Sequence, residues 1–128
     1  MALDQAIDEF ISTLEGPRRG ADGRFDWTEW ADTVRNQLRT LRDALQREAK
    51  DLRRRGDGWL DARDRTTDRT RRRLVQRLAA MGPRILERPE AETSLRELRR
   101  LGHDLEHYRQ RVHDLVYDAV ALELGGSE

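Results

Sequence analysis

The last quarter of the chain repeats apolar side chains at the spacing of a coiled coil. Between Pro89 and Leu124, the a and d positions of five successive heptads fall in register. The a positions are Ala91, Leu98, Leu105, Val112 and Ala119, and the d positions are Ser94, Leu101, Tyr108, Leu115 and Leu122. This period places all ten side chains along one face of a helix about 54 Å long. The chain must therefore fold so that this face is covered.

Glycine and proline divide the rest of the chain into three further helical stretches, and none alternates apolar and polar residues with the two-residue period of a strand. Ala, Glu, Lys, Leu and Arg make up 65 of the 128 residues, which is the composition of long helices. The predicted helices span residues 3–15, 26–55, 58–81 and 89–124. The third is set to end at Gly82-Pro83. The sequence thus predicts an all-α protein, with one domain over 1–124 and a mobile tail over 125–128.

Short connections between the long helices predict an antiparallel bundle, because loops of two to seven residues force neighbouring helices to run in opposite directions. We expect three long helices, the short first helix packed across them, and coiled-coil character in the last. The second helix starts with a capping box formed by Asp26 and Glu29. Its apolar seam, over 27–52, is interrupted by Glu48 and is expected to meet the last helix.

The last helix is longer than its neighbours, so part of its seam is left uncovered in a simple monomeric bundle. An exposed seam of leucine and valine usually finds a partner. We therefore predict that the chain associates with itself, as a homodimer or larger, and with an unidentified protein. The predicted interface residues are Leu98, Leu101, Leu105, Tyr108, Val112, Leu115 and Leu122. The alternative is that the second and third helices cover this seam lengthwise within one chain.

The net charge is zero, but the charges are unevenly distributed. Residues 47–77 carry 12 basic and 6 acidic side chains, and residues 101–128 carry 2 basic and 6 acidic ones. The basic block contains two triplets that a hairpin would set side by side, namely Arg53, Arg54, Arg55, Arg71, Arg72 and Arg73. Such arginines can follow a phosphate backbone through counterion release, so nucleic acid is the alternative partner. Interleaved acids and the acidic last helix favour internal neutralisation instead, and a lipid or granule surface is a minor alternative.

One short motif points to metal chemistry. The segment His103-Asp104-Leu105-Glu106-His107 matches the H-x-x-E-H pattern and so resembles the inverted zinc peptidases, in which two histidines bind the metal and the glutamate acts as base. The resemblance covers five residues. The heptad places His103 and His107 on the water side of the helix, whereas a catalytic zinc needs a third protein ligand in a dry cavity. We therefore predict no metal site.

Several chemistries have no motif in this chain. There is no cysteine, no Gly-x-Ser-x-Gly turn and no phosphate-binding P-loop. We therefore predict no catalytic residue and no cofactor, and a non-enzymatic interaction module acting as an adaptor or accessory subunit. No apolar run approaches the roughly 20 residues of a membrane span, and Asp4, Asp8 and Glu9 stand where a signal peptide would be basic and then apolar. We expect a cytoplasmic location.

Overall fold

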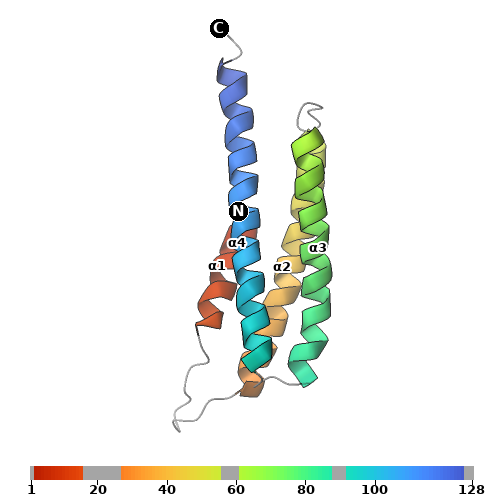
Figure 1. Ribbon diagram of the computed structural model, residues 1–128, viewed down its shortest axis with the longest axis vertical. Coiled ribbons are helices and arrows are strands. Elements are labelled where there is room, and N and C mark those ends of the chain that lie inside the picture. Colours follow the sequence, from red (N-terminus) through yellow and green to blue (C-terminus); the bar gives the residue numbers. More distant parts are fainter. Residues whose placement is uncertain (1, 16–26, 56–60, 88–91, 126–128) are drawn as a thin grey trace.

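The computed structural model describes residues 2–15, 27–55, 61–87 and 92–125, with side chains over 2–15, 27–51, 65–85 and 94–118. These residues form four helices and no strand. The helices are α1 (Ala2–Leu14), α2 (Trp27–Arg55), α3 (Asp61–Glu87) and α4 (Glu92–Gly125). Successive helices run in opposite directions, and the three long ones stand roughly parallel to one axis (Figure 1). The prediction of an all-α bundle with a short N-terminal helix is confirmed.

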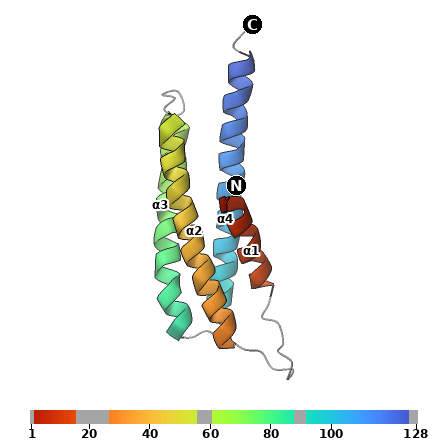
Figure 2. The same cartoon turned by 180° about the vertical axis from the view of Figure 1, so that it is seen from behind.

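The four helices are arranged around one core, with α2 and α4 on opposite sides of it. α1 packs between α2 and α4 on one flank, and α3 packs between the same two helices on the other. The sequence predicts that α1 packs across the long helices, but Figure 2 shows it running alongside α4. The reason is its amphipathic face, which buries Leu3, Ile7 and Phe10 lengthwise in the core.

A continuous apolar core runs through all four helices. The side chains that are least exposed are Ile7, Phe10, Val34, Leu41, Leu45, Leu74, Ile85, Leu98, Leu101, Leu105 and Tyr108. They include most of the seam positions of the second and last helices that lie in the lower part of the bundle. Since each fully buried aliphatic side chain stabilises the fold by about 1.5–3 kcal/mol, this core is the main favourable contribution to folding.

The predicted end of the third helix at Met81 is wrong, because α3 continues through Pro83 to Glu87. A proline inside a helix has no N–H for the carbonyl of Ala79 and costs about 3 kcal/mol. The extra turn places Ile85 in the core with none of its surface exposed. Its burial offsets much of that cost, since it extends the face already formed by Leu78 and Met81. The predicted starts at residues 58 and 89 lie outside the described residues.

Polar contacts hold α1 on both of its neighbours. The indole Nε1–H of Trp30 in α2 donates to the carbonyl of Thr13 at 3.2 Å. On the other side, Arg109 of α4 donates to the carboxylate of Asp8 at 2.8 Å and to the carbonyl of Asp4 at 3.2 Å. These bonds fix α1 along its length, with its C-terminal turn against the start of α2 and its N-terminal turn against the middle of α4.

α1 and α4 lie close together at Gly102. A Cβ atom placed there would lie 3.5 Å from Ile11 Cγ1 and 3.5 Å from Leu14 Cδ1, which is ordinary van der Waals contact. One methyl group therefore fits between the two helices without displacing Ile11 or Leu14.

We predict that Gly102→Ala raises the free energy of unfolding by about 0.5–1 kcal/mol, because alanine loses less backbone entropy in a helix. Gly102→Leu should lower it by roughly 1–3 kcal/mol, because the side chain wedges α1 away from α4. Urea denaturation of both variants measures this. A destabilised Gly102→Ala protein would show that the helices approach more closely than described.

Candidate functional site

The seam residues predicted as an interface are largely covered within the chain. Leu98, Leu101 and Leu105 have no exposed surface, and Tyr108 and Val112 are also buried. This is the arrangement in which the other helices cover the seam within one chain. Leu115 is buried as well, with 8% of its surface exposed, and the side chain of Leu122 lies outside the described residues. Any seam left for a partner lies in the last part of α4.

That last part of α4 carries an exposed aromatic side chain. Tyr117 is 74% exposed, and it stands out among the described residues as a large hydrophobic side chain in water. It lies one turn beyond His113, whose Nε2 is 3.3 Å from the carboxylate of Asp4 near the start of α1. In Figure 1, α4 continues well past both α1 and the upper end of α3. The heptad did not single out Tyr117 as an interface residue, since it lies at an f position, on the face of α4 that is turned away from the a and d seam.

The predicted arginine patch is divided by the fold. The side chains of Arg53, Arg54 and Arg55 lie outside the described residues. Arg71 points into the core and is only 4% exposed. Arg72 and Arg73 face water, and Arg72 Nη2 lies 3.0 Å from the carboxylate of Asp68. The triplet 71–73 therefore offers two arginines to a polyanion rather than three.

Arg71 belongs to a buried polar network that joins the three long helices. Its Nε–H donates to the hydroxyl of Tyr108 in α4 at 2.8 Å, and that hydroxyl donates to the carboxylate of Glu48 in α2 at 2.6 Å. Arg71 also donates to Asp68 at 3.0 Å, and its guanidinium lies 5.8 Å from the centre of the Tyr108 ring, within cation–π range. We call Glu48, Arg71 and Tyr108 the interhelical network.

Burial decides the protonation of this network. It raises the pKa of Glu48 above its ordinary value, although the hydrogen bond from Tyr108 and the charge of Arg71 act in the opposite direction. Burial and the nearby Glu48 carboxylate raise the pKa of Tyr108 far above its usual range, so the phenol stays neutral and donates. Because the phenol stays neutral and donates its hydrogen bond to Glu48, this network serves to align the helices.

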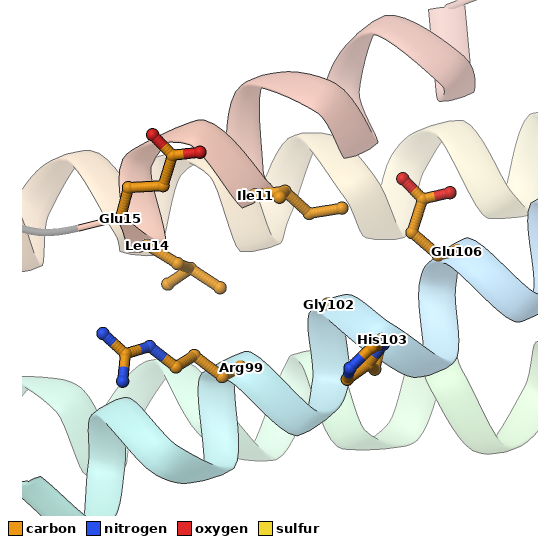
Figure 3. Close-up of a pocket in the computed structure, with 7 residues that line it drawn as sticks. All are labelled: Ile11, Leu14, Glu15, Arg99, Gly102, His103 and Glu106. Carbon is orange, nitrogen blue, oxygen red and sulfur yellow. The ribbon is translucent and has the colours of Figure 1, made fainter.

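An open pocket of about 500 Å³ lies between α1 and α4. Its lining residues are Ile11, Leu14, Glu15, Arg99, Gly102, His103 and Glu106. Figure 3 shows Ile11 and Leu14 projecting toward α4 near Gly102, while the carboxylate of Glu15 points away from α4. Glu106 is already engaged by the guanidinium of Arg109. The base of the pocket is apolar, and the charged side chains around its rim do not converge on one point.

The two histidines of the H-x-x-E-H segment lie on the exposed face of α4. The rings of His103 and His107 stack with their centres 6.2 Å apart. The carboxylate of Asp104 is paired with Arg77 at 2.6 Å, and the carboxylate of Glu106 is paired with Arg109. In the described part of the chain, no group of three or more His, Cys, Asp or Glu side chains is placed to hold a metal ion. The motif therefore acquires no third ligand from its surroundings.

A second groove, of about 360 Å³, lies between α2 and α3 and was missed by the sequence reasoning. Three arginines line it from α2, at positions 35, 39 and 42. The available signal was their spacing of four and then three residues, which puts all three on one helix face. The sequence-based prediction relied on the arginine triplets instead of this more regular spacing.

No protein-family profile matches the sequence, and comparisons with curated proteins and with solved structures found no significant match. Within the described ranges, no helix combines the length and apolar character needed to cross a membrane. The case for a function therefore depends on the geometry of this chain.

The interhelical network yields a test of stability. We predict that Tyr108→Phe lowers the free energy of unfolding by about 1–3 kcal/mol, because the partly buried Glu48 and the buried Arg71 each lose a hydrogen-bond partner. Tyr117→Phe makes the same chemical change at an exposed site and should have no measurable effect. Urea denaturation compares the two. Equal effects would show that the Tyr108 hydroxyl is not bonded as described.

The raised pKa of Glu48 yields a test of pH dependence. The folded protein holds the Glu48 proton more tightly than the unfolded chain does, so this residue makes folding less favourable as pH rises through its raised pKa. Glu48→Gln keeps an acceptor for Tyr108 and removes this titration. Between about pH 4 and pH 7, the stability of the variant relative to wild type should therefore rise. Asp51→Asn, at an exposed site one turn away, should show no such trend.

Proposed function

We propose that this protein is a non-enzymatic helical interaction module, an adaptor or accessory subunit, that associates with itself through the last part of α4. The observation that carries the proposal is the difference in length between α1 and α4. α1 has 13 residues and α4 has 34, which correspond to about 20 Å and 51 Å. Roughly 30 Å of α4 has no α1 beside it.

The lower part of the bundle has four helices in cross-section, and the upper part has fewer. Figures 1 and 2 both show α1 beside the lower part of α4 only, with the end of α4 extending beyond the other helices. The partly buried Val116 and the exposed Tyr117 lie in this upper part. A helix from a partner, laid along α4 above α1, would restore the four-helix cross-section.

A second copy of the chain is the partner that fits this place most simply. It has the same uncovered stretch of α4, so a two-fold arrangement covers both stretches at once. The absence of cysteine is compatible with action in the reducing cytoplasm.

Light scattering coupled to size exclusion tests this proposal, on untagged protein at low and high salt. We expect wild type to elute with twice its chain mass of 15.0 kDa at both salt concentrations. Tyr117→Arg should shift it to the single-chain mass with unchanged helicity, because this side chain is already in water and contributes little to the core. Leu115→Arg is a less specific probe, since Leu115 is buried within the chain.

The control is His107→Arg, which places the same charge on an exposed position of α4 beside α1 and should leave the mass unchanged. A wild-type protein that is monomeric at all concentrations would contradict self-association. A dimer that survives Tyr117→Arg would contradict the assignment to α4. Excess absorbance at 260 nm that salt removes would instead favour the nucleic-acid alternative.

A further inference from the structure

The groove between α2 and α3 is lined by positive charge and apolar surface, on the flank of the bundle formed by these two helices. Its full lining is Arg35, Leu38, Arg39, Arg42, Leu78, Ala79, Gly82 and Pro83. The lining contains three guanidinium groups and no carboxylate. The arginines follow one face of α2 over about 10 Å, as the 1.5 Å rise per residue requires.

These arginines differ from the other arginines that pack between helices. Three arginines that bridge two helices elsewhere in the described structure each meet a carboxylate of the neighbouring helix. The pairs are Arg77 with Asp104, Arg84 with Glu97, and Arg109 with Asp8. Among the residues whose side chains are described, the groove arginines have no such partner on α3, although α3 forms the opposite wall.

The three groove arginines are almost unpaired among the described residues. The single ion pair they form joins Arg42 Nε to Asp43 at 4.0 Å, the outer limit for such a contact. The Nε–H of Arg35 is buried and has no hydrogen-bond partner. A buried donor without a partner is costly, and like charges one helical turn apart repel each other. An anion in the groove would relieve both costs.

The opposite wall of the groove, formed by α3, is apolar and is made mostly of small side chains. Ala79 and Pro83 are exposed at the groove, while Leu38 and Leu78 form its buried base. A Cβ atom on Gly82 would lie 3.8 Å from Arg35 Cγ, so the glycine leaves room beside the stem of that arginine. The volume of about 360 Å³ falls in the lower part of the range for small-molecule pockets, about 300–1,000 Å³.

We propose that the α2–α3 groove binds a small organic anion, with a phosphate or carboxylate head held by Arg35, Arg39 and Arg42 and an apolar body against Ala79 and Pro83. The planar guanidinium group pairs with either head group through two parallel hydrogen bonds. This site is independent of self-association, because it lies between α2 and α3 whereas the uncovered stretch belongs to α4.

The experiment uses phenyl phosphate as the probe, with inorganic phosphate and phenol as its two halves. Each is titrated into the full-length protein at low salt while backbone amide shifts are followed by NMR. Phenyl phosphate should bind saturably, with shifts concentrated in residues 35–42 and 78–83. Each half should bind at least about tenfold more weakly, because the head group and the apolar body contribute separately.

Matched arginine variants locate the site. Arg39→Gln and Arg42→Gln together should weaken phenyl phosphate binding by about tenfold or more. Arg47→Gln removes an exposed charge from another face of α2 and should leave the affinity unchanged. Ala79→Leu fills the apolar wall without changing charge and should also weaken binding. Unchanged circular dichroism of all variants shows that the fold is retained.

Four outcomes would overturn the proposal. Equal weakening by Arg47→Gln would mean that the anion responds to overall charge and not to the groove. Inorganic phosphate binding as tightly as phenyl phosphate would remove the role of the apolar wall. Absence of saturable shifts in α2 and α3 would exclude the site. Tight, salt-sensitive binding of a single-stranded oligonucleotide by the same arginines would show that the groove binds a nucleic-acid polymer instead of a small anion.

Discussion

The hydrogen bonds from Arg71 to Tyr108 and from Tyr108 to Glu48 join the three long helices at one level of the bundle. Apolar side chains alone accept many relative positions of two helices, because their contacts have no direction. The partly buried carboxylate of Glu48 and the buried guanidinium of Arg71 are different, since each is costly unless its partner stands in one place. We infer that this network fixes the register of α2, α3 and α4, and that the apolar core supplies most of the stability around it.

The short α1 completes the bundle over only part of the length of α4. Its apolar face closes the core between α2 and α4, and the bond from Arg109 to Asp8 holds its first turns. Asp4 and His113 mark the point where this cover stops. The same helix that makes the lower half a four-helix bundle therefore defines the stretch of α4 that remains open. The proposed self-association follows from this difference in length.

Periodicity predicted the apolar faces of the helices well, because it depends on residues only a few positions apart. It predicted the seams of α2 and α4 and the amphipathic first helix. It could not predict that α3 passes through Pro83, since that depends on how well Ile85 fits a core built by other helices. It also placed Arg71 on the surface, because the partner of this side chain lies 37 residues away in the sequence. Glu48 was visible as an interruption of a seam, and Tyr108 as a d position, but only the fold brings them together.

The arginines that lie between helices fall into two groups, which differ in the side chains that they face. Arg77, Arg84 and Arg109 each meet a carboxylate across a helix–helix contact, so their charge is used in holding the bundle together. The arginines at positions 35, 39 and 42 face an α3 wall made of leucine, alanine, glycine and proline. Among the described residues, the contact that offsets the repulsion between these three arginines is a single ion pair at 4.0 Å, between Arg42 and Asp43. The proposed anion would supply the remaining compensation from outside the chain.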